Sequence, residues 1–241
     1  MSAQNPFFEI SLLPYEAPRF DVITDQHYRP AFDEAVRQKR DEIAAIIANP
    51  AAPDFANTVL ALEQSGTMLS RVTAVFFAMT SADTNDYLQT LDEAFSAELA
   101  ELADDIWLNA ALFARVDAVY QTRHSSGLDA ESLRLVETLW QQFMLAGARL
   151  GDEQKAQLKA LNQEAARLTS QFNNRLLAAN KAGALVIDDV AQLNGLSEEE
   201  IAAAAEAARA RGLEGRWVLP LLNTTQQPAL AALETRTTRE T

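Results

Sequence analysis

The sequence predicts a mainly α protein, an antiparallel array of helices with a small two-stranded β element near residues 184–187 and 216–219. Glycine is scarce, with 8 in 241 residues, and the bias toward alanine, leucine and glutamate favours helix over turn-rich β architecture. Hydrophobic residues make up 48% of the chain and charged residues 22%, which is typical of a folded rather than a disordered protein. This length allows one large domain or two small ones.

The N-terminal part is expected to be an extended arm over residues 1–25. Its prolines bias the residues before them away from helix, and they are Pro6, Pro14 and Pro18. Helical periodicity begins around Pro30, a residue suited to a first helical turn, and stops at Asn49, which precedes a proline.

Three helical patterns follow in the first half of the chain. Residues 58–79 form one helical region with Gly66 as a weak point. In the clearest pattern, apolar residues recur at every third or fourth position, namely Leu88, Leu91, Phe95, Leu99, Leu102 and Ile106. Asn109 is expected to cap a shorter continuation that ends near Gly127.

Two more helices complete the expected helical domain, which spans residues 26–182. Asp129 is a candidate N-cap for the first of them. The second, over residues 153–181, is the longest, and at a rise of about 1.5 Å per residue it spans roughly 40 Å. Its apolar stripe consists of Leu158, Leu161, Ala165, Leu168, Phe172, Leu176 and Ala179.

The pattern changes over residues 183–241, which are expected to form a small β/helix segment. The β-branched runs at 184–187 and 216–219 predict its two strands. Between them, Ser197 and Glu200 predict a capping box at the start of a helix that Gly212 ends. A last helical stretch is expected from Pro228 to Thr241; it has no stop signal, which indicates truncation.

Composition and charge exclude several classes of function. The net charge of −14 speaks against a nucleic-acid partner, because phosphate binding needs clustered lysine and arginine. There is no cysteine, and therefore no disulfide framework, thiolate metal site or thiol nucleophile. No signal peptide and no run of roughly 20 apolar residues is visible, so we expect a cytoplasmic protein without a membrane partner.

Candidate metal ligands and nucleophiles are few. The two histidines, His27 and His124, lie far apart in the sequence, and the chain has no H-E-x-x-H pair, a common zinc-binding motif. We expect His27 to be a helix-entry residue and His124 to be solvated. The G-x-S-x-G, G-x-G-x-x-G and P-loop patterns are also absent.

Acidic clusters provide the remaining candidates. The carboxylates on the clearest helix are Glu98, Glu101, Asp104 and Asp105, and we interpret them as an acidic solvated face because a di-iron site also needs Glu-x-x-His pairs. Glu198, Glu199 and Glu200 are explained by the positive end of a helix dipole. The aromatic residues on helical stripes are expected to be core: Phe76, Phe77, Phe95, Trp107, Trp140 and Phe172.

Five stretches in order carry a family resemblance. They read DQHYRPAFDEA over residues 25–35, DFANTVLALEQSG over 54–66, LSRV over 69–72, LTSQFNNRLLAAN over 168–180, and GRWVLPLLNTTQQP over 215–228. Together they resemble the N-terminal portion of the thimet oligopeptidase and oligopeptidase A family of zinc metallopeptidases, and are closest to its bacterial peptidyl-dipeptidase branch. The resemblance covers essentially the whole chain.

This resemblance implies a larger, nearly all-helical parent with two lobes facing a channel that admits short peptides, from which this branch removes C-terminal dipeptides. The parent's zinc is held by the histidines of an H-E-x-x-H helix and a downstream glutamate, while the glutamate of that motif activates water. No position here matches those residues, so we predict no catalytic, cofactor-binding or metal-binding residue in this chain. It is expected to form a channel wall and to support the missing C-terminal catalytic domain, with apolar faces available for self-association.

Two other interpretations remain open. A freestanding helical interaction module without enzymatic activity fits the same apolar stripes. A small metal-independent hydrolase that uses scattered carboxylates is the third possibility.

Overall fold

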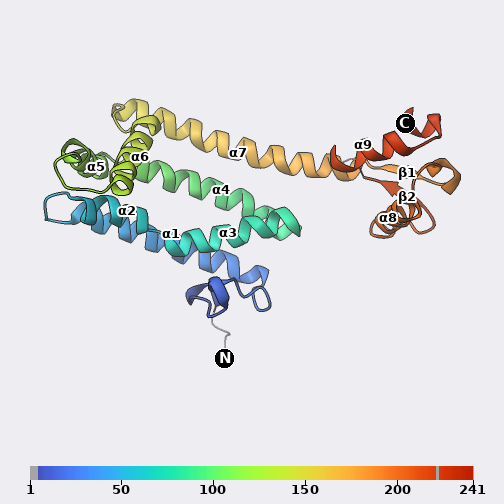
Figure 1. Ribbon diagram of the computed structural model, residues 1–241, viewed down its shortest axis with the longest axis horizontal. Coiled ribbons are helices and arrows are strands. Elements are labelled where there is room, and N and C mark those ends of the chain that lie inside the picture. The colour runs from blue at the N-terminus through green and yellow to red at the C-terminus, as the bar shows by residue number, and fades with distance from the viewer. Residues whose placement is uncertain (1–4, 221–222, 241) are drawn as a thin grey trace. The chain divides into compact units, whose positions relative to one another are not determined.

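The computed structural model describes residues 5–220 and 223–240 of the chain. Its contacts divide the chain into two compact units, Met1–Ser170 and Gln171–Thr241. Helices dominate both units, and the described strands form a two-stranded antiparallel sheet in the second (Figure 1). The predicted mainly α class with a small β element is therefore confirmed, whereas the expected domain limits remain predictions.

The N-terminal segment contains two short 3-10 turns, Pro6–Phe8 and Pro14–Glu16. The side chain of Phe7 is buried between helices of the first unit. The Arg71 guanidinium donates a hydrogen bond of 2.7 Å to the carbonyl oxygen of Phe7. The beginning of this segment is therefore attached to the helical core, although residues 1–4 of the expected arm lie outside the described residues.

Helix α1 spans Asp25–Ala48. It begins five residues before Pro30, so the expected start around Pro30 was wrong. A capping box of Thr24 and His27 accounts for this start, because it satisfies backbone N–H groups that the first turn leaves without a helical partner. Pro30 lies inside the helix, where its missing N–H removes one helical hydrogen bond.

The single helical region expected over residues 58–79 is also wrong in detail. The structure has a π-helix, Phe55–Leu60, a short α2, Ala61–Gln64, and then α3, Thr67–Ala82. The predicted weak point is confirmed, since Gly66 separates α2 from α3 with a left-handed φ of 79°.

The helices that follow agree with the sequence pattern, except that the helix after Asn109 ends at Thr122 and not near Gly127. They are α4, Asp86–Trp107, α5, Ala110–Thr122, α6, Ala130–Ala146, and α7, Asp152–Ala182. As predicted, the side chain of Asn109 caps α5 by accepting the backbone N–H of Leu112 at 3.0 Å. Asp129 caps α6 in the same way.

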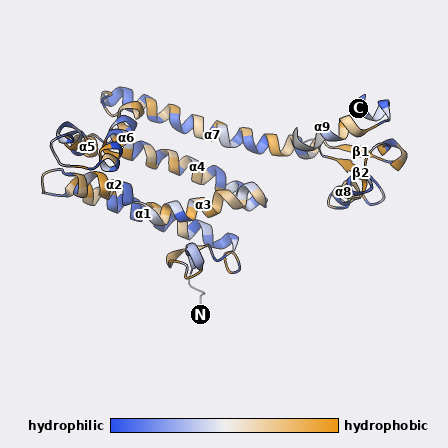
Figure 2. Cartoon of the chain, in the orientation of Figure 1, coloured by the Kyte–Doolittle hydropathy of each residue, from blue (hydrophilic) through white to orange (hydrophobic). Residues whose placement is uncertain are grey.

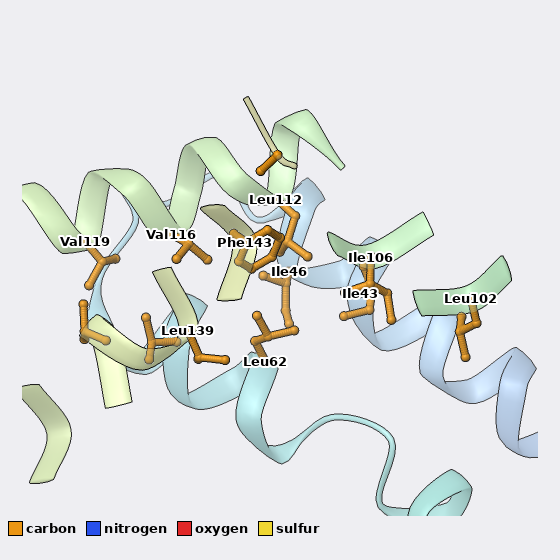
Figure 3. Close-up of a cluster of buried hydrophobic side chains, with 13 residues drawn as sticks. Ile43, Ile46, Leu62, Leu102, Ile106, Leu112, Val116, Val119, Leu139 and Phe143 are labelled. Carbon is orange, nitrogen blue, oxygen red and sulfur yellow. The ribbon is translucent and has the colours of Figure 1, made fainter. Parts of the chain in front are cut away.

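The core of the first unit consists of two clusters of buried apolar side chains. One joins α1, α2, α4, α5 and α6, and its labelled members in Figure 3 include Ile46, Leu112 and Phe143. The other joins the N-terminal segment to α1, α3 and α4, and in it the rings of Phe32 and Phe95 stack with centroids 3.8 Å apart. This burial of side chains from helices far apart in the sequence holds the first unit together.

The second unit contains the small sheet. Strand β1, Leu185–Ile187, pairs with β2, Trp217–Leu219, as predicted, and the structure shows that the pairing is antiparallel. Between them lie a 3-10 turn, Val190–Leu193, and helix α8, Glu198–Arg209.

The last helical stretch differs from the expectation of one helix from Pro228 to Thr241. Helix α9, Asn223–Ala232, begins before Pro228, and α10, Arg236–Glu240, follows a break. At that break the backbone N–H of Glu234 donates to the Asn194 carbonyl at 2.8 Å, a contact that replaces a helical hydrogen bond. Thr241 lies outside the described residues.

Candidate functional site

The two histidines have separate roles and surroundings. The Nδ1 atom of His27 accepts the backbone N–H of Thr24 at 3.0 Å, so His27 is the helix-entry residue that was predicted. His124 is exposed in the turn after α5, as expected for a solvated residue. Within residues 5–220 and 223–240, no group of three or more histidine or acidic side chains is placed so that it could hold a metal ion.

The four carboxylates on α4 do not converge on one point. Glu98 pairs with Arg29 of α1 at 2.6 Å, and Asp105 pairs with Lys159 of α7 at 2.9 Å. Glu101 is exposed. The carboxylates therefore join α4 to two different neighbours, and they lack the shared geometry of an acid–base pair.

Asp104 corrects the expectation of an acidic solvated face, because it is only 7% exposed. Its Oδ1 accepts the side-chain amide of Asn162 on α7 at 2.7 Å, while its Oδ2 is buried without a hydrogen-bond partner. Helix α7 covers this position, and the spacing of residues along α4 alone could not reveal that cover.

The acidic residues at the start of α8 are structural, as expected. The backbone N–H of Ser197 donates to Glu200 Oε2 at 2.8 Å, and the backbone N–H of Glu200 donates to Ser197 Oγ at 3.3 Å. The backbone and hydroxyl hydrogen bonds from Ser197 lower the pKa of Glu200. Glu198 and Glu199 share this first helical turn, where the dipole favours negative charge.

The aromatic prediction holds with one exception. Phe76 and Phe95 are fully buried, and Phe77, Trp107 and Trp140 pack partly buried against the two core clusters. Phe172 was expected in the core but is 64% exposed, so that interpretation was wrong. Hydropathy along α7 alternates between hydrophilic and hydrophobic residues (Figure 2), which indicates the apolar side of the helix but not what covers it.

A buried arginine that the sequence did not single out organises the turn after α1. Arg115 of α5 is 9% exposed, and its Nη1 donates to the carbonyl oxygen of Asn49 at 2.9 Å. Its Nη2 donates to Oδ1 of Asn57 at 3.0 Å, an atom that also accepts the backbone N–H of Asp54 in the capping box of the π-helix. Arg115 therefore links the end of α1 to the start of the π-helix.

The N-terminal segment carries an exposed apolar strip. Its large side chains, which we call the apolar strip, are Phe8, Ile10, Leu12, Leu13, Tyr15, Phe20 and Val22. Leu12 and Tyr15 are fully exposed, at 100% and 103%. So dense a set of exposed apolar side chains in one short segment is the feature of the first unit that best fits an interaction surface.

Each unit also has a cleft. In the first unit, a cleft of about 480 Å³ begins at Phe20 of the apolar strip and continues along Tyr28, Met79 and Leu88. In the second, a mostly apolar cleft of about 550 Å³ lies between α8, β2 and the last helices. Neither cleft gathers a nucleophile and a base in the arrangement that catalysis needs.

No family model matches the chain. Its similarity is nevertheless to peptidases, since it is 24% identical to oligopeptidase A of Haemophilus influenzae over 241 residues, which cover 34% of that protein. More particularly, it is similar to dipeptidyl carboxypeptidase. It is 70% identical to that of Salmonella typhimurium over 98% of this chain and 68% identical to that of Escherichia coli over 100% of it.

The chain spans 35% of the length of these two relatives. The predicted resemblance to the N-terminal portion of such a peptidase is therefore confirmed. Among the described helices, none is long and apolar enough to cross a membrane.

Proposed function

We propose that this chain is the N-terminal, non-catalytic helical portion of a cytoplasmic zinc metallopeptidase that removes C-terminal dipeptides from short peptides. In that enzyme it forms one wall of the substrate channel and supports the C-terminal catalytic domain. The observation that carries the proposal is the 70% identity to a dipeptidyl carboxypeptidase, which runs through 98% of this chain but covers only 35% of the relative.

The described residues do not fit a zinc site. Its ligands must be deprotonated groups that converge on one point. His27 is engaged in a helix cap, His124 is exposed in a turn, and the α4 carboxylates are directed to separate partners. We therefore assign no metal site to the described residues.

A freestanding interaction module would also expose apolar side chains such as those of the apolar strip. The identity to peptidases over nearly the whole chain favours the scaffold of a peptidase over that alternative.

The experiment is a chimera in which this chain replaces the matching 240 residues of the Escherichia coli dipeptidyl carboxypeptidase. The chimera should release C-terminal dipeptides from short peptides and lose this activity with a metal chelator, whereas the isolated chain should release none. A folded but inactive chimera, or chelator-resistant cleavage by the isolated chain, would contradict the proposal.

A further inference from the structure

We propose that the apolar strip is the surface on which the remainder of the peptidase polypeptide packs. This inference rests on the proposed function and deepens it, because it names the part of the scaffold that contacts the rest of the enzyme. The chain spans only 35% of its relatives, so the larger part of such a polypeptide is available as the occupant.

Exposure is the first argument. Leu12 and Tyr15 at the centre of the strip are fully exposed, and Ile10 and Phe20 on either side of them are more than half exposed. Leaving such side chains in water forgoes the stabilisation that burial of apolar area provides. So many exposed apolar side chains in one short segment of a folded unit mark a surface that a partner covers.

The strip is attached to the folded core at its beginning, which distinguishes it from a loose tail. Phe7, just before it, is buried against Tyr28, with ring centroids 5.6 Å apart. The side-chain amide of Asn5 donates to the carbonyl oxygen of His27 at 2.8 Å. A surface attached in this way loses less conformational entropy when a partner binds to it.

Backbone geometry supplies an independent observation at the most exposed point. Tyr15 and Glu16 have φ angles of 60° and 55°, the left-handed region that residues other than glycine rarely adopt. Backbone hydrogen bonds from the Glu16 N–H to the Leu13 carbonyl and from the Ala17 N–H to the Pro14 carbonyl close this turn, while the Tyr15 side chain has no cover in the first unit. A partner packed over the turn Pro14–Glu16 would add the side-chain contacts that Tyr15 lacks.

Charge disfavours a second copy of this chain as the partner that covers the strip. Glu9 and Glu16 lie between members of the strip in the sequence, the cation of this segment, Arg19, is paired with Asp21, and Asp25 and Asp83 line the adjoining cleft. In a two-fold symmetric dimer these acidic groups would face their own copies, on chains that each carry a net charge of −14. The remainder of a longer polypeptide is free of this restriction.

The test is hydroxyl-radical footprinting of the isolated chain and of the Escherichia coli chimera. Oxidation of Leu12 and Tyr15 should fall several-fold in the chimera, because packing excludes water from both side chains. Leu145 on α6, 80% exposed in the same unit, is the reference for general changes in reactivity. Equal oxidation of Leu12 and Tyr15 in the two proteins would overturn the inference.

Two other occupants would give different results in the isolated chain. Protection of the strip that grows with protein concentration would identify a second copy, and protection that does not depend on concentration would identify the second unit of this chain. Either result would overturn the inference. Footprinting reads packing in any folded chimera, so an inactive chimera with a protected strip would contradict the proposed function alone.

A stability comparison adds a second readout. The double substitution Leu12→Asp with Tyr15→Asp should lower the Tm of the chimera and leave that of the isolated chain unchanged, because the strip is exposed only in the latter. Leu145→Asp is the matched control and should change neither. Equal Tm shifts in both proteins would show that the strip acts only within this chain and would overturn the inference.

Discussion

Replacing Arg115 with methionine should destabilise the first unit substantially. The guanidinium donates hydrogen bonds of 2.9 Å to the Asn49 carbonyl and 3.0 Å to Asn57 Oδ1. A hydrogen bond that involves a charged group contributes about 1.5–3 kcal/mol, so two of them amount to roughly 3–6 kcal/mol. Methionine avoids the cost of burying a charge, and this offsets part of the loss. We therefore expect a decrease of about 3 kcal/mol in the free energy of unfolding.

The assay is urea unfolding followed by tryptophan fluorescence in a Trp217→Phe background. Of the three tryptophans, only Trp107 and Trp140 then remain, and both pack against a core cluster of the first unit, so the signal reports that unit alone. Arg167→Met is the matched control. Arg167 is half exposed in an ion pair with Glu164, and because solvent screens such surface pairs its loss should change the free energy of unfolding far less than the loss of Arg115.

A loss for Arg115→Met no larger than that of the control would refute this account of the turn after α1. A double-mutant cycle with Asn57→Ala separates the contact itself from general disruption. Because Arg115 donates a hydrogen bond directly to Asn57, the decrease in the free energy of unfolding of the double mutant should be clearly smaller than the sum of the two single-mutant decreases.

Three further predictions concern other parts of the first unit. Phe95→Ala should lower the free energy of unfolding, measured in urea, by about 3–5 kcal/mol, because it leaves a cavity where a fully buried aromatic ring was. Gly66→Ala should lower the free energy of unfolding more than Gly127→Ala does. Both glycines have positive φ, but only at Gly66 would the new Cβ lie 2.7 Å from a side-chain atom, the Cδ of Lys39, which would have to shift. The Arg37 guanidinium lowers the pKa of Glu34 from its ordinary 4.5 to about 2. The Glu34 carboxylate should therefore contribute its full stabilisation above pH 4.5 and lose it as the pH falls toward 2. Acid unfolding of Glu34→Gln, compared with that of the wild type, measures this contribution. Identical acid transitions in the two proteins would contradict the prediction.

The sequence was most informative where local chemistry determines the structure. Asn109 and Ser197 were identified as caps from their residue type and position, because a side-chain oxygen there satisfies a backbone N–H of the first turn. The strands near 184–187 and 216–219 were found in the same way, from short β-branched runs.

Features that depend on distant residues could not be predicted. The π-helix Phe55–Leu60 continues an ordinary helical pattern, and its start is held by Arg115, which is remote in sequence. Asp104 was expected in solvent because periodicity along α4 does not reveal that α7 covers it. The prediction for Phe172 was wrong in the opposite sense: it was expected in the core but is exposed. An apolar stripe on α7 does not show whether another element covers it.

Zinc stoichiometry is the most direct test of the claim that this chain is a scaffold without catalytic machinery. After dialysis against trace zinc, the isolated chain should retain essentially none, while the Escherichia coli chimera should retain about one ion per molecule, as a single-zinc catalytic site requires. Stoichiometric zinc on the isolated chain, lost on His27→Ala or His124→Ala substitution, would contradict the account.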